Sequence, residues 1–526
     1  TVGWTGRYEN MNNMRVSTNG GLVTENWFDL NASRYTPSST LQRMELLKTG
    51  YMGTLSLGWD NYLFLELTGR QERSSTLKDQ SFFYPSANLS FLFTQAFHMP
   101  SWWNYGKLRL SYGIVGNAPE TYTANIVYEQ GSDNGFTWNT IPSSWGNADI
   151  RPEKKYEYEI GLESKFLNNR LGIDVSYYNN RVKDQILSTP QPSTSGVKNV
   201  LMNVGEVANH GWDISISATP ILTRDFRWDL TANYGVYKNK VVKLADGVPY
   251  LEILNSGGSG IKIQAVEGQP MGDIYAQVPQ VNENGEYLVS DKGLYLNQTE
   301  LQKVGNINPA GVGGLFNSFS YKNVFLDFSI DFRIGGDVIN EMNQYATAVG
   351  LTPESLKYRD TEHGGLSYYY PGDNNSSGIP VQVDPSTGAG PNGEIIYHDG
   401  IILPGVVAST GERNTRIIPA GYYYNTTYNW GTEAEQLTYR HSVFDNSYVK
   451  LRELTIGYQF PEKMISKLGL GRLSVSVFGR NLFYFYKALK NYDAESSVGT
   501  SWANQATVGS STTATRSFGV SLRASF

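Results

Sequence analysis

The chain has 526 residues, of which 40% are hydrophobic and 17% charged, and its 36 tyrosines and 54 glycines are typical of a large β protein with many turns. A formal net charge of −6 gives no basic footprint for nucleic acid, and the absence of cysteine excludes disulfides, thiolate metal sites and a cysteine nucleophile. No run of about eighteen apolar residues occurs, which excludes a transmembrane helix but not a membrane β-barrel, because barrel strands alternate in polarity.

In chain order, residues 1–48 are weakly patterned and predict at most one strand, at 2–8, followed by a polar loop. Alternation starts at Tyr51 with a hairpin over 51–70. Further alternating segments predict strands at 85–93, 107–114, 156–163, 171–177, 212–219 and 226–234.

The clearest pattern is a hairpin over residues 313–336. In its second strand Val324, Leu326 and Phe328 share one face, while Asp327 and Asp331 lie on the other. About ten residues suffice for a tilted strand to cross a bilayer, so the hairpin fits a membrane barrel. A sandwich strand with one buried face fits it equally well.

The connections between the predicted strands decide between these alternatives, because short and long ones alternate strictly. A sandwich has no reason to send every long loop to one end, whereas outer-membrane barrels have short periplasmic turns and long extracellular loops. The prediction is therefore an all-β chain, a transmembrane antiparallel β-barrel of about 13 or 14 strands. The short connections lie at 59–61, 98–105, 167–170, 220–225, 322–323 and 461–471, and the long ones at 71–84, 116–155, 187–208, 242–312, 335–447 and 487–514.

Six blocks resemble, in order, those of the SusC/RagA family of TonB-dependent transporters from Bacteroidetes outer membranes, and the resemblance covers nearly the whole chain. The most specific is the penultimate hairpin, residues 446–486, with SYVKLR (447–452), LTIGY (454–458), Pro461 and GRNLF (479–483). The others are FYPS (83–86), RPEK (151–154), NVGEV with NHGW (203–212), GNINP (305–309) and DFRIGG (331–336). The final strand, which ends at Phe526, resembles the signal that the barrel-assembly machinery reads.

The resemblance implies an importer with a barrel of about 22 strands, an internal plug and a SusD-like surface lipoprotein as its lid. It further implies energy from TonB–ExbB–ExbD and contact with outer-membrane lipids. Residues 1–526 would then be the C-terminal portion of the barrel domain, and the plug, the TonB box and the early strands would lie outside this chain. A passive or structural barrel is the alternative.

Charged residues on the predicted lumen face are expected to hold the plug through ion pairs and hydrogen bonds. The alternative is that they are only solvated side chains on the inner wall of the barrel. Polar contacts in water can break and remake, as a moving plug requires. The candidates are Glu157, Glu159, Asp213, Arg227, Asp327, Asp331, Arg333, Arg472 and Arg480.

Aromatic residues in the long loops are candidates for stacking on sugar rings or packing on a lid protein, since flat apolar faces with polar tips suit both contacts. Ordinary loop packing is the alternative for each. Tryptophans near short turns, such as Trp59 and Trp102, are expected at the membrane interface. The loop candidates are Trp138, Trp145, Tyr368, Tyr369, Tyr370, Tyr422, Tyr423, Tyr424, Trp430 and Trp502.

The sequence does not predict an enzyme or a cofactor. Its five histidines are far apart, and no nucleophile elbow or phosphate-binding loop occurs. Asp373, Asn375, Ser377 and Asp384 give a weak EF-hand-like spacing for calcium, with a polar loop as the alternative. The predicted function is active import of a large nutrient, with the aromatic loops favouring an oligosaccharide over an oligopeptide.

Overall fold

The computed structural model describes residues 1–78, 80–133, 136–256, 260–359, 365–372, 378–428, 438–496, 501–509 and 514–525. The chain divides into two compact units. Unit 1 comprises Thr1–Ile216 and Tyr237–Pro249, and unit 2 comprises Ser217–Val236 and Tyr250–Phe526.

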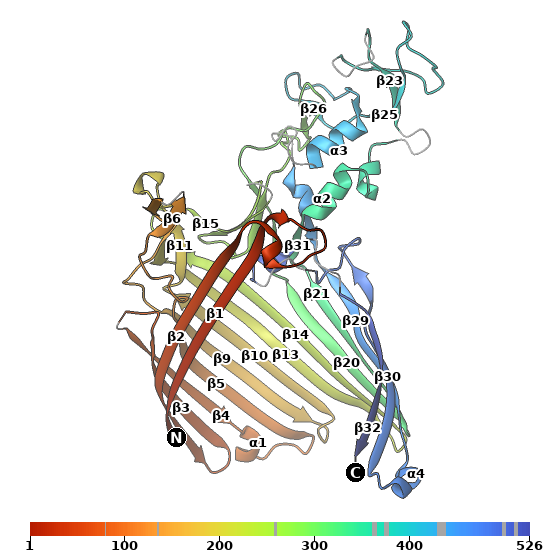
Figure 1. Ribbon diagram of the computed structural model, residues 1–526. Helices are drawn as coiled ribbons and strands as arrows, with labels where there is room; N and C mark the ends of the chain where they lie inside the picture. The colour runs from red at the N-terminus through yellow and green to blue at the C-terminus, as the bar shows by residue number, and fades with distance from the viewer. Residues whose placement is uncertain are drawn as a thin grey trace. The chain divides into compact units, whose positions relative to one another are not determined.

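Fourteen strands of the described chain form one sheet, in which the strands are paired in chain order, and this number agrees with the prediction. Figure 1 shows β3, β4, β5, β9 and β10 side by side in unit 1, and β20, β21, β29 and β30 in unit 2. The strands are β1 (Val2–Leu22), β2 (Ser33–Trp59), β3 (Leu63–Ser74), β4 (Ser81–Phe91), β5 (Trp103–Asn117), β9 (Glu153–Phe166), β10 (Leu171–Lys183), β13 (Glu206–Leu222), β14 (Phe226–Lys243), β20 (Gly311–Tyr321), β21 (Val324–Ile334), β29 (Tyr448–Gln459), β30 (Arg472–Lys487) and β32 (Ser517–Ser525).

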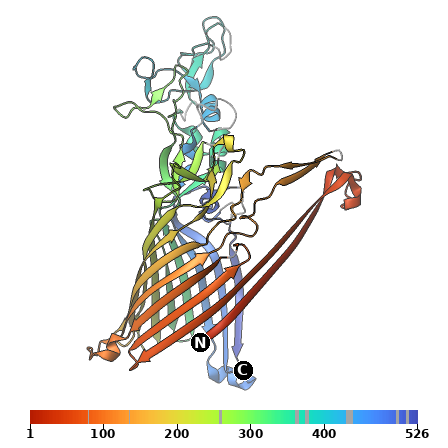
Figure 2. The same ribbon diagram turned by 90° about the vertical axis from the view of Figure 1, so that its left-hand side faces the viewer.

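The prediction for residues 1–48 is wrong, because β1 and most of β2 occupy this stretch as one long hairpin. Leu22 pairs with Ser33 at its tip and Val2 with Gly53 at its base. In Figure 2 the hairpin extends well past the ends of β3 and β4. With 21 and 27 residues, its strands exceed the ten or so that a bilayer requires.

Most of the predicted short connections between the strands are confirmed, but the one at 98–105 runs into β5, which begins at Trp103. After Trp59, for example, Asp60 and Asn61 adopt φ values of 47° and 59°, the left-handed conformation that Asn and Asp tolerate best and that closes tight hairpins. The alternation of short and long connections is less strict than predicted. Residues 75–80 link β3 to β4 and form a shorter connection than residues 92–102, which carry the short helix α1 (Phe93–Ala96).

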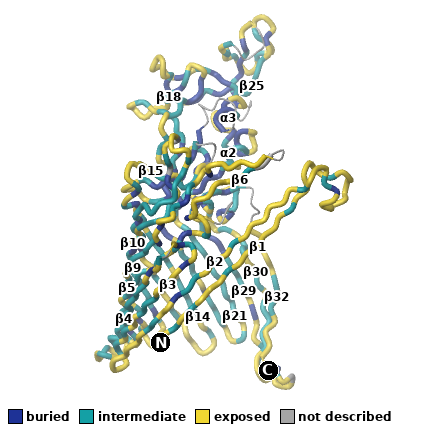
Figure 3. Tube along the Cα trace, turned by 60° about the vertical axis from the view of Figure 1, so that its left-hand side comes forward, coloured by how far each residue is buried: buried dark blue, intermediate teal, exposed yellow. Residues whose placement is uncertain are grey.

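The two longest connections of unit 2 fold into a body of their own, here called the loop assembly and defined as residues 250–310 and 335–447. In Figure 3 buried residues concentrate there, whereas the sheet strands of unit 2 are mostly intermediate or exposed. Its elements are β15 (Tyr250–Ser256), β16 (Ile261–Val266), β17 (Asp273–Ala276), β18 (Leu288–Val289), β19 (Gln302–Asn306), β22 (Asp337–Asn340), α2 (Glu341–Ala348), β23 (Leu366–Tyr369), β24 (Val381–Gln382), β25 (Tyr397–Ile401), β26 (Val406–Val407), β27 (Ile418–Pro419), α3 (Ala420–Tyr428) and β28 (Val443–Asp445).

A small apolar cluster lies around Tyr368, Tyr370 and Ile417, and two larger cores hold the loop assembly together. One surrounds Ile261, Ile263 and Ile274 and takes in residues of the loop after β30. The other joins Leu294 and Ile401 to the tyrosines of α3. Smaller strands occupy the other long connections: β6 (Glu129–Asp133), β7 (Phe136–Thr140), β8 (Ser144–Trp145), β11 (Ile186–Pro190) and β12 (Asn199–Asn203) in unit 1, and β31 (Thr507–Val508) in unit 2, where the short helix α4 (Glu462–Ile465) follows β29.

None of the helices in the described ranges is long and apolar enough to cross a membrane.

Candidate functional site in the loops and along the strand wall

Beyond the β1–β2 hairpin, the sheet strands carry apolar side chains on one face and charged side chains on the other. On β9, Tyr158 and Ile160 are exposed, whereas Glu157 and Glu159 on the opposite face are only partly so. Apolar residues exposed in rows suit contact with lipid, so the charged face is the one that can line a wet interior.

Most of the predicted plug contacts have a partner inside this chain. Arg227 pairs with Asp229 at 2.5 Å, Arg480 with Glu453 at 2.9 Å, and Glu157 with Lys155 at 2.6 Å. The hydroxyl of Ser318 donates to Asp327 at 2.6 Å, and Arg333 donates to the carbonyl oxygens of Ile307 and Gly335. These side chains brace the wall itself, whatever else they contact.

Glu159, Asp213 and Arg472 differ from this set, because none of them forms an ion pair or side-chain hydrogen bond with another described residue, although the charge of Glu159 acts on Arg109 and that of Asp213 on Tyr178. They are the predicted plug contacts whose charges are the most available to another part of the protein. Whether they contact a plug stays a prediction.

Four charges form a network that ties the loop after β30 to the wall of unit 2. Arg452 on β29 pairs with Asp331 on β21 at 2.6 Å and with Glu495 in the loop at 2.5 Å. Lys450, whose side chain is only 2% exposed, also pairs with Glu495 at 2.5 Å. Burial alone would raise the pKa of Glu495, but the hydrogen bonds from Arg452 and Lys450 lower it below its ordinary value.

The two predicted tyrosine triplets are mainly packing residues. Tyr368 and Tyr370 are almost fully buried, and so are Tyr423 and Tyr424. Burial raises the pKa of Tyr423, and its ring contacts those of Tyr424 and Tyr428 edge to face. The loop-packing alternative is therefore favoured for these four. Tyr369 is partly exposed and Tyr422 is 37% exposed.

Three of the four predicted loop tryptophans can be placed. Trp138 on β7 is 48% exposed and Trp502 is 37% exposed, so both present a ring to solvent. Trp145 is partly buried and packs edge to face on Tyr128. Trp430 lies outside the described residues.

A cavity of about 440 Å³ opens in the loop assembly where β27 leads into α3, and sequence reasoning did not find it as a site. It brings Tyr370 and Tyr422, one from each triplet, together with Lys292 and Arg416. The remaining lining residues are Gly378, Pro380, Ile417, Ile418 and Pro419. Arg416 and Lys292 lie in no sequence motif that could identify them as site residues, because only the fold brings them together.

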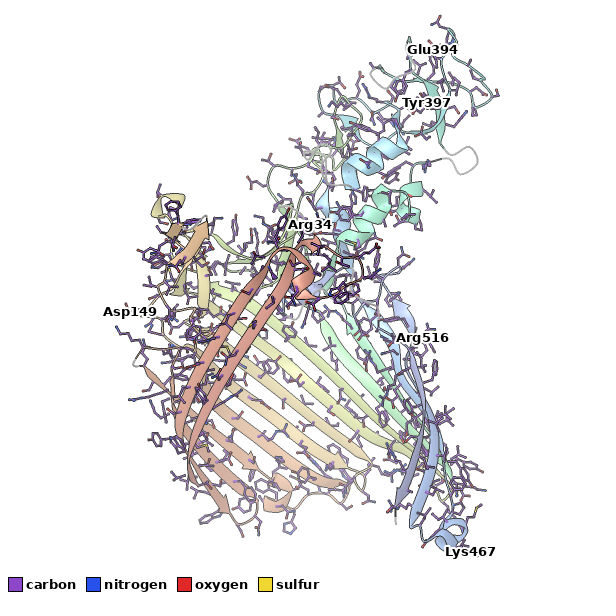
Figure 4. The ribbon with its side chains drawn as sticks, in the orientation of Figure 1. Arg34, Asp149, Glu394, Tyr397, Lys467 and Arg516 are labelled. Atoms are coloured by element: carbon purple, nitrogen blue, oxygen red, sulfur yellow. The ribbon has the colours of Figure 1, made fainter. Side chains whose placement is uncertain are left out.

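A hydrogen-bonded turn stiffens the loop assembly near β25. The carboxylate of Glu394 accepts hydrogen bonds from the backbone N–H of Asn392 at 2.8 Å and of Gly372 at 3.2 Å. These bonds to the charged form, above all the one from Asn392, lower the pKa of Glu394 to about 2. Figure 4 places Glu394 and Tyr397 together at the outer part of this assembly.

A second cavity, of about 370 Å³, lies in unit 1 beside the NVGEV block. Asn203 holds this region together, since its side-chain amide donates to the carbonyl oxygens of Arg151 and Asp184 and its Oδ1 accepts from the backbone N–H of Arg151. Two of the family-like blocks, RPEK and NVGEV, are therefore joined by the hydrogen bonds between Asn203 and Arg151.

The calcium prediction is largely outside the described residues, because Asp373, Asn375 and Ser377 are not among them. Asp384 is, and its Oδ1 accepts from the backbone N–H and the hydroxyl of Ser386. Among the described residues no cluster of His, Asp or Glu suits a metal ion. Calcium at this loop stays a prediction.

The family model and the curated relatives that match this chain all describe TonB-dependent receptors. Residues 2–274 match the family described as TonB dependent receptor-like, beta-barrel. TonB-dependent receptor P3 of Formosa agariphila is 24% identical over 494 residues, which are 85% of this chain and 42% of that protein. TonB-dependent receptor SusC of Bacteroides thetaiotaomicron is 30% identical over 247 residues, 43% of this chain and 24% of SusC.

Solved structures agree on the fold. The RagAB peptide importer in its "open-open" state matches with a TM-score of 0.71 at 18% identity, over 99% of this chain and 52% of that chain. The "closed-closed" state of the same importer matches with a TM-score of 0.68. The chain thus spans about half the length of the RagAB chain it resembles, and less than half of the curated relatives.

Proposed function

Because this chain belongs to the TonB-dependent receptor-like β-barrel family, we propose that the complete protein is an energised outer-membrane importer of SusC/RagA type that takes up an oligosaccharide. The chain is an outer-membrane protein by its family and its relatives. Its fourteen strands supply the larger part of a barrel, and the rest of the barrel and the plug would come from the part of the polypeptide outside this chain.

The proposed partners follow from the relatives. One relative is the TonB-dependent receptor SusC, and one solved structure of the same fold is the RagAB peptide transporter. By analogy we propose a SusD-like lipoprotein lid over the loops, and the TonB–ExbB–ExbD complex as the source of energy. The substrate would be held between the lid, the loops and the plug. No catalytic role is proposed.

The observation that favours a sugar over a peptide is the set of partly exposed rings in the long connections. Trp138, Trp502 and Tyr422 each present an aromatic surface to solvent. A sugar ring has an apolar face that stacks on such rings, while its hydroxyl groups bond to the polar tips. RagAB is a peptide importer, which makes an oligopeptide the alternative substrate, but at 18% identity the match shows the fold alone.

The test is deletion of the gene in its native host, followed by growth on single polysaccharides and on peptide mixtures as the carbon source. We expect growth to fail on one glycan, and the full-length gene to restore it. A version lacking the TonB box should not restore it, although it reaches the membrane.

Three other outcomes would count against the proposal. If the deletion strain fails to grow on peptides but grows on every glycan, the imported substrate is a peptide. Rescue by the version without the TonB box would indicate a passive pore. If the full-length protein purifies without any surface lipoprotein, the proposed lipoprotein lid is wrong.

A further inference from the structure

The cavity between β27 and α3 has the size and charge of a ligand site. Its volume of about 440 Å³ falls within the usual range for small-molecule sites. Among the described residues that line it, Lys292 and Arg416 are cationic and none is acidic. A concave surface with this charge attracts an anionic group.

Arg416 is held rigidly at this surface. The residues after it, Ile417 and Ile418, are each 3% exposed and enter two different apolar clusters. Gly293, at φ +85°, lies against its aliphatic stem, since a Cβ built there would be 3.5 Å from Cδ of Arg416. The backbone N–H of Arg416 donates to Asn414 at 3.0 Å. A guanidinium whose backbone and stem are packed in this way loses less conformational entropy on binding than one on a free side chain.

The guanidinium also has unused hydrogen-bonding capacity. Nε of Arg416 is buried and has no hydrogen-bond partner among the described residues. Buried donors are nearly always paired in folded proteins, so this one has capacity left for a bound water, an ion or a ligand. The planar guanidinium fits a carboxylate, which can accept two parallel N–H bonds from it.

An aromatic surface lies beside these cations. Tyr422, on the first turn of α3, is 37% exposed and lines the same cavity, and the nearly buried Tyr370 closes another side. Arg416 is close enough to Tyr370 to act on the pKa of its hydroxyl, which burial raises and the guanidinium opposes. The site therefore offers a ring to stack on and a cation beside it.

We propose that this cavity binds a sugar residue that carries a carboxylate, with the carboxylate on Arg416 and Lys292 and the sugar ring against Tyr422. The imported substrate would accordingly be an acidic oligosaccharide, a uronic-acid polymer in chemical class. This inference rests on the proposed function and makes its substrate class more specific.

The test is calorimetric titration of the full-length protein, purified in detergent with whatever lipoprotein accompanies it. The probes are oligogalacturonate and oligomannuronate, a neutral oligogalactose of the same length, and an acidic peptide of the same length. We expect a uronide to bind, and to bind more weakly as salt is raised. Arg416→Gln should weaken its binding about tenfold or more, because a charge-assisted hydrogen bond is lost.

Arg413→Gln is the matched control, since Arg413 is an exposed arginine three residues away that does not line the cavity. Lys292→Gln should weaken uronide binding in the same direction as Arg416→Gln. Tyr422→Ala should weaken both the uronide and any neutral sugar.

The inference is overturned if neither uronide binds better than the neutral sugar, or if Arg416→Gln behaves like Arg413→Gln. Tight binding of the neutral sugar would then leave glycan import standing without the acidic subsite. Binding of the acidic peptide but of no sugar would overturn both the inference and the proposed substrate.

Discussion

At the scale of single residues, His441 combines a stacked ring with an unfavourable site for positive charge. Its ring lies parallel to that of Tyr428, with centroids 4.5 Å apart. Burial lowers its pKa to about 4, and the charges of Arg440 and Lys357 act in the same direction. Between about pH 6.5 and pH 4 the unfolded chain therefore binds a proton at this position that the folded chain does not. The loop assembly should lose stability as the pH falls through this range.

We expect urea to unfold the loop assembly at a lower concentration at pH 5 than at pH 7, as measured by tyrosine fluorescence of the full-length protein. His441→Phe retains a ring on Tyr428 but cannot take up a proton, so its unfolding midpoint should differ less between the two pH values. An unchanged difference in the variant would show that other groups cause the pH dependence.

At the scale of elements, the loop after β30 is tied to the wall by Glu495, which pairs with both Arg452 and Lys450. Glu495→Gln should leave the nearly buried Lys450 without its counter-ion, at a cost on the order of 3 kcal/mol. Hydrogen exchange of residues 488–496 should then be faster by roughly a hundredfold, because 1.4 kcal/mol corresponds to a factor of ten. Glu453→Gln is the control, since its partner Arg480 is largely exposed and the pair should contribute little. Equal effects of the two variants would contradict the special role of Glu495.

At the scale of the whole molecule, the sheet has two end strands. In the described chain β1 and β32 each have one neighbour in the fourteen-stranded sheet. Unpaired backbone groups cost several kcal/mol each in hydrocarbon, so these strands need further partners in a membrane. Residues 1–526 refolded alone into detergent should give no heat-modifiable band on a denaturing gel, whereas the full-length polypeptide should give one. A stable band from residues 1–526 alone would mean that the two end strands can meet.

The sequence predicted the strands wherever one face contacts an apolar medium, as in β9, β10 and β21, because only there does burial force alternation on every second residue. It failed for the β1–β2 hairpin for the same reason. Both faces are largely exposed along most of this hairpin, so Asn10, Asn12 and Asn13 can follow one another without regard to side. Hydrogen bonds between the two strands define the hairpin, and composition does not reveal them.

The candidate site was less predictable because long-range packing decides it. Tyr422 and Tyr423 are neighbours of the same type, yet the first is 37% exposed and the second 3%. The ion pair between Lys450 and Glu495 joins residues that are 45 positions apart. No local pattern marks such residues, whereas the six family-like blocks were visible because each is continuous in sequence.

The separate cores of the loop assembly have a consequence for how the protein is made. A barrel that enters its membrane from the periplasmic side must carry each long connection across the bilayer, and a body with a packed interior is too wide to follow a hairpin through. We therefore expect the loop assembly to cross as an extended chain and to acquire its cores on the outer surface. Without cysteines, no oxidation step in the periplasm can lock these loops into a folded form before they have crossed.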